Sequence, residues 1–259
     1  MERIIDLNCD MGESFGEYRI GGDETIIDHI TSANIACGFH ASDPTVMDRT
    51  VRLCKAHGVM AGAHPGYPDM VGFGRRFMDI AEADLINDVV YQVGALKGFL
   101  DRYRLPLQHV KLHGALYNFM VNEADLFLKL ALVLREAFAN PVLLTLGTEK
   151  TTALKETFRR QGLRLALEAF PDRAYTDDGE LMPRKITGSV FKDPEVIARR
   201  AAEMAFDRAV QSAGGRRLQI DIDTLCLHGD NRESIEAAER IVRSCRQAGI
   251  ALKPLAEFI

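Results

Sequence analysis

The stretch NIACGFHASDPTVMDRTVRLCKAHGVMAGAH, residues 34–64, carries the alternation that decides the fold. It opens with a short apolar run ending at His40, and it closes with a second apolar run ending at His64. Between the two runs we expect a helix that Asp43 caps and Gly58 ends. The stretch therefore predicts a strand, a helix and a second strand that pairs in parallel with the first.

The same alternation continues along the chain. Strands are predicted at 3–9, 34–40, 59–64, 109–114, 141–147, 163–170 and 223–229, with a short extra strand possible at 250–255. Helices are predicted at 42–58, 81–103, 123–138, 148–161 and 193–212, with a last one running to Gln247. An even run of about seven such units predicts an α/β fold, a seven-stranded (β/α) TIM-like barrel, rather than an open doubly wound sheet. No GxGxxG follows the first strand, and no linker interrupts the pattern, so we expect a single barrel domain over residues 1–259.

Composition narrows the possible functions. The chain has 259 residues, of which 47% are hydrophobic, and a net charge of -5, which argues against a nucleic-acid partner. Glu2 and Arg3 and the lack of an apolar core at the N-terminus argue against a signal peptide, and no apolar run is long enough for a membrane span. The five cysteines form no CxxC pair, which favours reduced thiols and a cytoplasmic location.

Polar residues interrupt strands that should be apolar on both faces. In the first strand Asp6, Asn8 and Asp10 share one face, because side chains alternate along a strand. An unpaired buried charge costs several kcal/mol. These carboxylates must therefore be paired, bound to a metal, or close to a solvent-filled barrel mouth.

Histidines gather at the ends of the predicted strands. Four of the seven lie there: His40, His64, His113 and His228. In β/α barrels the carboxyl ends of the strands carry the active site, so these four predict one shared polar site. Lys111 shares a strand face with His113, and Asp230 shares one with His228. The other three histidines, His29, His57 and His109, and the thiol of Cys37 are interpreted as structural.

Two long loops reach the same end of the barrel. Residues 64–79 combine glycine, proline and aromatic residues with Arg75 and Arg76, and residues 171–189 carry Arg173. Loops of this length and composition are typical of ordered, functional segments. An arginine in either loop could grip a carboxylate or phosphate, although each one alone could equally be a solvated surface charge.

Six segments in chain order carry a family resemblance. They are DLNCDMGESFG, NIACGFHASDP, GAHPGYPDMVGFGRR, HVKLHGALYN, EAFPDRAYTDDGELMPR and CLHGD. Over nearly the whole chain they resemble the lactam-utilization protein family, which comprises the A subunit of 5-oxoprolinase. One departure is Leu112, where the family usually has proline.

The resemblance implies a barrel similar to those of glycoside hydrolases and polysaccharide deacetylases. It also implies an activity: hydrolysis of 5-oxoproline to glutamate, coupled to ATP hydrolysis, together with partner subunits B and C. The chain itself has no GxxxxGK[ST] loop, so we expect the partner subunits to handle ATP while the barrel opens the ring.

The roles expected at the site follow from residue chemistry. Asp10, Glu13 or a histidine would act as general base, and Lys111 would stabilise developing negative charge. The donor of a proton to the leaving nitrogen would be His113 or His228, with Asp230 fixing the tautomer of His228. Substrate-binding candidates are Asn8, Asn34, His40, His64, Arg75, Arg76 and Arg173.

Two alternatives stay open. A stand-alone metal-dependent amidase or carbohydrate deacetylase would bind a divalent metal and need no ATP. Its metal ligands would come from Asp10, His40, His64 and His113, although no local spacing demands a metal. A non-catalytic substrate-binding protein is the second alternative, and it predicts histidines that tolerate mutation.

Overall fold

A closed barrel of seven parallel strands forms the centre of the protein, seen here in a computed structural model that describes residues 3–228 and 232–259. The strands follow the order β1-β2-β3-β4-β5-β6-β9, and β9 pairs back onto β1 to close the ring. They are β1 (Arg3–Met11), β2 (Ser32–Ala36), β3 (Met60–His64), β4 (Leu107–Lys111), β5 (Val142–Leu146), β6 (Leu165–Ala169) and β9 (Thr224–His228). The predicted seven-stranded β/α barrel is therefore confirmed.

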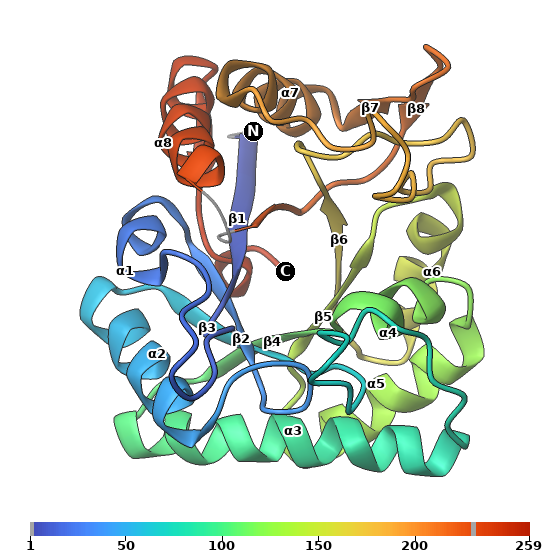
Figure 1. The fold of residues 1–259 in the computed structure, drawn as a ribbon. Coiled ribbons are helices and arrows are strands. Elements are labelled where there is room, and N and C mark those ends of the chain that lie inside the picture. The colour runs from blue at the N-terminus through green and yellow to red at the C-terminus, as the bar shows by residue number, and fades with distance from the viewer. Residues whose placement is uncertain (1–2, 229–231) are drawn as a thin grey trace.

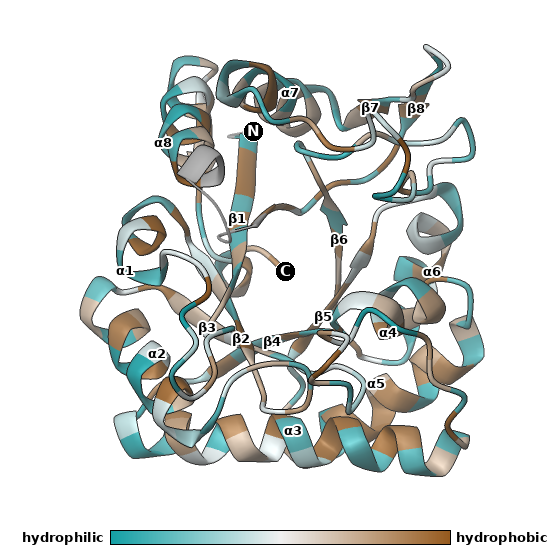
Figure 2. Cartoon of the chain, in the orientation of Figure 1, coloured by the Kyte–Doolittle hydropathy of each residue, from teal (hydrophilic) through white to brown (hydrophobic). Residues whose placement is uncertain are grey.

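Helices enclose the strands on all sides (Figure 1). They are α1 (Asp23–Ile26), α2 (Pro44–His57), α3 (Glu82–Tyr103), α4 (Gly114–Met120), α5 (Ala124–Phe138), α6 (Glu149–Arg160), α7 (Pro194–Asp207) and α8 (Arg232–Gln247), with the 3-10 turns η1 (Ile27–His29) and η2 (Leu255–Glu257). The larger helices carry hydrophobic and hydrophilic residues on different sides (Figure 2), as expected when one side packs on a sheet. Within the described residues no helix is both long and apolar enough to cross a bilayer.

The helix α2 shows how sequence sets the local structure. The carboxylate of Asp43 accepts hydrogen bonds from the backbone N–H groups of Thr45 and Val46 at 2.8 and 2.9 Å, which caps the first turn. Pro44 occupies that turn, where its missing N–H is not needed. Gly58 ends the helix in a left-handed conformation, with φ of 68°. The helix therefore begins and ends where the sequence predicts.

The helix α7 is shorter than predicted. We expected it to reach Ser212, but it ends at Asp207, and Arg208 takes a left-handed conformation. The following residues form an antiparallel hairpin of β7 (Ala209–Gln211) and β8 (Arg217–Gln219). Apolar residues of this segment are buried in the hairpin, and that burial outweighs a continued helical pattern.

The amino-terminal end of the barrel is closed by the carboxyl-terminal segment. The predicted extra strand exists as β10 (Ile250–Leu252), which pairs with the first residues of β1. In the turn η2, Leu255 is fully buried against Val142, Leu144 and Ala166 of β5 and β6. The carboxyl terminus lies at the middle of the ring in Figure 1. The carboxyl end of the strands, where the βα loops gather, is the open end, and it is the place where β/α barrels form their active sites.

Candidate active site at the carboxyl end of the barrel

The inner face of β1 is polar, as the sequence predicts, and its side chains are bonded across the barrel. The amide nitrogen of Asn8 donates to Glu168 at 2.9 Å and to Thr224 at 2.6 Å. The amide nitrogen of Asn34 donates to the side-chain oxygens of Asn8 at 2.6 Å and Asp10 at 2.8 Å. The two asparagines, proposed from the sequence to orient substrate, have these groups engaged within the protein.

Lys111 lies at the centre of this network. Its Nζ lies 3.0 Å from Asp10 Oδ1, 3.0 Å from Glu168 Oε1 and 2.9 Å from Cys226 Sγ. Burial alone would lower the pKa of Lys111, but the carboxylates of Asp10 and Glu168 outweigh it and hold that pKa well above its usual value. Lys111 is therefore a buried ammonium group. It can therefore stabilise negative charge on a ligand that binds at the mouth of the barrel.

Glu168 is held by a third donor, in addition to Asn8 and Lys111. The hydroxyl of Tyr117, on α4, donates to Glu168 Oε2 at 2.9 Å. Burial, and then the charge of Glu168, raises the pKa of Tyr117 well above its usual value. Burial likewise raises the pKa of the Cys226 thiol well above its usual value, so this thiol stays protonated beside Lys111.

The predicted histidines His40, His64 and His113 meet just above Lys111. The ring nitrogens His64 Nε2 and His113 Nδ1 lie 2.9 Å apart, and His64 Nε2 lies 3.4 Å from Asp10 Oδ2. Glu13 Oε1 lies 4.0 Å from His113 Nδ1. Three separate strands and loops thus bring these groups to one point, as the strand-end pattern predicts.

The ring of His40 stacks on the ring of His113, with centroids 3.7 Å apart and an interplanar angle of 3°. His40 is fully buried, and neither of its ring nitrogens has a hydrogen-bond partner among the described residues. Burial, followed by the neighbouring His113 and His64, lowers the pKa of His40 well below its usual value. Burial and His64 lower the pKa of His113 to about 3.

Glycines in the loop after β3 let the backbone approach these rings closely. A Cβ atom on Gly74 would lie 2.8 Å from both His40 Cβ and His113 Cδ2. A Cβ atom on Gly66 would lie 2.9 Å from His40 Nδ1. The glycine-rich composition of residues 64–79 therefore has a physical reason, since larger residues would push the histidines apart.

His109 has a structural environment, in line with its sequence interpretation. Its Nε2 donates to Asn34 Oδ1 at 2.7 Å, and Gln108 Nε2 lies 3.2 Å from its Nδ1. Burial lowers the pKa of His109 to about 3. His57 is bonded to Asp28 at the surface, 2.7 Å away, and is remote from the barrel mouth.

A cavity of about 490 Å³ opens over Lys111, His64 and His113. Its wall comes from the βα loops and from residues 180–185 of the loop after β6. Five cationic side chains and two carboxylates line it: Arg75, Lys111, Arg173, Arg184, Lys185, Asp10 and Glu180. The excess of positive charge suits an anionic ligand.

Two of the three arginines predicted to bind substrate line the cavity, and the third does not. Arg75 and Arg173 line the cavity, and Arg173 Nη2 also donates to the carbonyl oxygen of Met182 at 2.6 Å. Arg76 instead binds Asp69 within its own loop, with Nε 3.0 Å from Oδ2, and does not line the cavity. We expected Arg76 to contact substrate, but it instead forms an ion pair with the buried carboxylate of Asp69.

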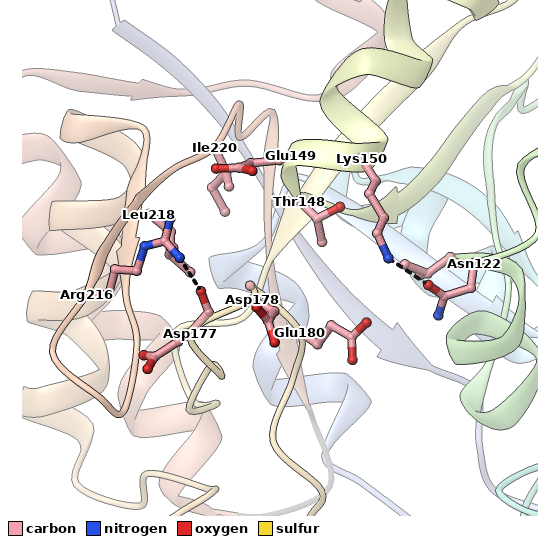
Figure 3. A pocket seen from close by; sticks show the side chains of 12 residues that line it. Asn122, Thr148, Glu149, Lys150, Asp177, Asp178, Glu180, Arg216, Leu218 and Ile220 are labelled. Carbon is pink, nitrogen blue, oxygen red and sulfur yellow. Dashed lines mark hydrogen bonds between the residues drawn. The ribbon is translucent and has the colours of Figure 1, made fainter.

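A second cavity of about 350 Å³ lies beside the first and shares Val121, Asn122 and Glu180 with it. Figure 3 shows Arg216 and Lys150 on opposite sides of it, with the carboxylates of Glu149, Asp177, Asp178 and Glu180 around the space. Four carboxylates against two cations make it less suited to an anion than the cavity over Lys111. Among the described residues, no histidine and no buried lysine lines it.

Two predicted residues follow or end β9. The backbone of His228 ends that strand and pairs in register with Asp10, at the same end of the barrel as the site. Asp230 lies outside the described residues. Three members of the network were not predicted as site residues: Glu168, Tyr117 and Cys226. Glu168 alone has a sequence signal, a single carboxylate in the apolar strand LALEA.

Comparison with known proteins fixes the family. A model of the LamB/YcsF family matches residues 5–259. The chain belongs to the LamB/YcsF family. This agrees with the resemblance carried by the six sequence segments.

Relatives of this LamB/YcsF protein are similar over nearly their full length. A Pyrococcus furiosus protein that is named as the A subunit of 5-oxoprolinase is 44% identical over 255 residues, which cover 98% of this chain and 99% of the relative. The crystal structure of a lactam utilization protein from Thermus thermophilus is 42% identical, with a TM-score of 0.87, covering 96% of this chain and 99% of that one. A β-N-acetylhexosaminidase from Streptomyces coelicolor, at 12% identity and a TM-score of 0.53, covers 98% of this chain and 65% of its own and shares the fold alone.

Proposed function

We propose that this LamB/YcsF protein is the ring-opening component of an ATP-dependent 5-oxoprolinase. It would hydrolyse 5-oxoproline to glutamate while partner subunits B and C bind ATP. The names of the relatives support the substrate. The observation that carries the chemistry is the buried ammonium of Lys111, 3.0 Å from Asp10 at the floor of a cationic cavity.

The substrate's own chemistry explains the need for ATP. An unstrained lactam has a poorly electrophilic carbonyl and a poor leaving nitrogen. Transfer of the γ-phosphoryl group from ATP to the lactam oxygen releases ADP and leaves a carbon that water can attack. Water then adds to that carbon, the C–N bond breaks, and the nitrogen takes a proton to become the amine of glutamate. The phosphate leaves from the new carboxyl group with a second water.

The cavity residues fit these steps. Arg75, Arg173 or Arg184 would bind the substrate carboxylate or the phosphoryl group through their forked donors. Lys111 would stabilise the negative charge that develops on the oxygen atoms attached to the reacting carbon. Asp10, bonded to Lys111 and open to the cavity, would take the proton from water and pass it to the leaving nitrogen.

Reconstitution tests the proposal. The purified chain is combined with subunits B and C, and glutamate release from 5-oxoproline is measured with and without ATP. We expect release only when all three proteins and ATP are present. Glutamate formed by this chain alone without ATP would reject the partner-dependent scheme and favour the metal-dependent amidase.

A second arm separates catalysis from mere substrate binding. In the same assay, the complex that contains the variant Lys111→Met should release no glutamate, whether its binding of 5-oxoproline is weakened or unchanged. Full turnover by this variant would contradict a catalytic role for Lys111 and favour the remaining alternative, a non-catalytic substrate-binding protein.

A further inference from the structure

The two imidazoles at the cavity floor present lone pairs to each other. His64 Nδ1 lies 2.8 Å from the carbonyl oxygen of Lys111, and His113 Nε2 lies 2.9 Å from the carbonyl oxygen of Phe73. A carbonyl oxygen only accepts, so both of these nitrogens carry protons. In the neutral rings, the opposite nitrogens, His64 Nε2 and His113 Nδ1, are therefore unprotonated.

These unprotonated nitrogens are only 2.9 Å apart. Two lone pairs at that distance repel each other unless a cation lies with them. Such a cation is either a proton or a metal ion. The carbonyl contacts of the outer nitrogens are the arrangement that orients histidine ligands in metal sites, because they fix both tautomer and ring direction.

Further groups around the pair favour a metal ion over a proton. One carboxylate oxygen of Glu13 and one ring nitrogen of each of His40, His64 and His113 all lie within 4.8 Å of one another. A proton would satisfy only the pair His64 and His113. It would leave His40 fully buried, with neither nitrogen bonded to any described residue.

We propose that His40, His64, His113 and Glu13 bind one divalent transition-metal ion at the floor of the cavity. Imidazole nitrogen and carboxylate oxygen suit zinc and its neighbours in the first transition row. Bonds of roughly 2.1 Å place tetrahedral ligands about 3.4 Å apart. His64 and His113, whose facing nitrogens are 2.9 Å apart, must therefore separate slightly, while Glu13, 4.0 Å from His113, must move closer.

The ring of His40 makes the largest adjustment. Its parallel stacking on His113 prevents both rings from directing in-plane lone pairs at one ion. Rotation of the His40 ring about its Cβ–Cγ bond ends the stacking and gives a buried nitrogen a partner. The loop glycines Gly66 and Gly74 lie against these rings and hold the remaining atoms close.

This inference does not depend on the proposed function, because metal binding is measured without substrate. Purified full-length chain is stripped with a chelator, and Zn²⁺ or Co²⁺ is added back. Isothermal titration gives affinity and stoichiometry, and the visible spectrum of Co²⁺ reports the ligand geometry. We expect about one ion per chain, with absorption typical of four-coordinate Co²⁺.

The variants His64→Ala and His113→Ala should each weaken binding at least about 100-fold, and Glu13→Gln at least about tenfold. His57→Ala is the matched control, because His57 is a surface histidine bonded to Asp28 and should leave binding unchanged. Circular dichroism checks that each variant is folded. Glu13→Gln keeps the size of the side chain and so tests the site even if a histidine variant fails to fold.

Nitrogen NMR of the histidine rings distinguishes the two cations. Zn²⁺ bound at the site shifts the His64 and His113 signals in the intact protein. The proposal is overturned if the intact chain binds neither Zn²⁺ nor Co²⁺ at micromolar concentration. It is also overturned if affinity is the same in the folded variants, or if the signals do not move because a proton already occupies the position.

Discussion

The two ends of the barrel interior both bury polar side chains, but they differ in how completely those side chains are hydrogen-bonded. At the closed end, Asp6 accepts hydrogen bonds from Thr31 at 2.7 Å, from Ser32 at 2.5 Å and from Thr224. Gln108 donates to Ser32 and accepts from the backbone of Ala256. Each of these side chains has its partners within the protein, so this end is suited to specify the barrel rather than to bind a ligand.

At the open end, the groups are as deeply buried but less completely matched. His40 has no hydrogen-bond partner among the described residues, and His64 and His113 turn unprotonated nitrogens toward each other. Burial of unmatched polar groups costs free energy, and sites that retain them are commonly functional. The difference teaches that the degree of hydrogen-bond satisfaction, rather than the polarity of the residues, separates scaffold from site.

The largest effect is expected on kcat, from substitution of Lys111, which ends β4 below the open end of the barrel. In the reconstituted complex, Lys111→Met should lower kcat by at least about 10³-fold, because it removes the charge that stabilises the transition state. Lys129→Met is the control, since Lys129 is an exposed residue paired with Glu82. Steady-state kinetics with 5-oxoproline gives the result, and equal kcat values for the two variants would contradict the role of Lys111.

Gly62 tests how tightly the interior is packed around His109. A Cβ atom there would lie 2.1 Å from His109 Nε2. Gly62→Ala should therefore lower the free energy of unfolding by at least about 3 kcal/mol, because a well-packed interior cannot absorb the overlap. Denaturant unfolding measures it.

Gly98→Ala provides the opposite case in the same experiment. Gly98 lies inside the helix α3, and a Cβ atom there would meet no atom within 4 Å. This substitution should stabilise the protein by about 0.5–1 kcal/mol. If Gly62→Ala leaves the free energy of unfolding unchanged, the ring of His109 is free to move aside.

Asp6 should make the closed end sensitive to pH. Burial raises the pKa of Asp6 to about 6 in the folded protein, above its ordinary value near 3.8. Between these two values the folded state holds a proton that the unfolded state releases. The stability due to Asp6 is thus present below about pH 4 and falls by about 3 kcal/mol as pH rises to about 6.

The variant Asp6→Asn isolates this contribution. The difference in unfolding free energy between the wild type and Asp6→Asn should shift against the wild type from pH 4 to pH 6. Urea unfolding at several pH values measures the difference, which also cancels the similar titration of Asp23. A pH-independent difference would argue against a raised pKa at Asp6.

A pair of single substitutions, one at each end of the barrel interior, compares the two ends directly. Thr224→Val removes a hydroxyl that bonds both Asn8 and Asp6, so it should destabilise the protein by about 1–2 kcal/mol. His40→Leu, made in metal-free protein, removes no hydrogen bond seen among the described residues and should change stability by less than about 1 kcal/mol. Thermal unfolding of both variants measures the contrast, and a larger loss for His40→Leu would reverse it.

The sequence by itself determined the barrel and the end at which its polar groups collect. Asp43, Pro44 and Gly58 set one helix through local contacts, and the end of β3 at His64 lies where the sequence predicts it. The strand predicted at 109–114 instead spans Leu107–Lys111, so its end was placed too late. Local rules failed where burial across the chain prevails, as in the hairpin that ends α7 at Asp207. They also gave no sign that α4 would form.

Only the tertiary structure decided which polar residues meet. Nothing local predicts that Tyr117 reaches Glu168, that Cys226 lies beside Lys111, or that Arg76 binds Asp69. Direction matters as well as distance: the tautomers of His64 and His113 depend on backbone carbonyls that only the folded loops supply. The physical reason is that pairing of buried charges and hydrogen-bond direction depend on contacts between distant segments, whereas strand and helix patterns depend on neighbours in sequence.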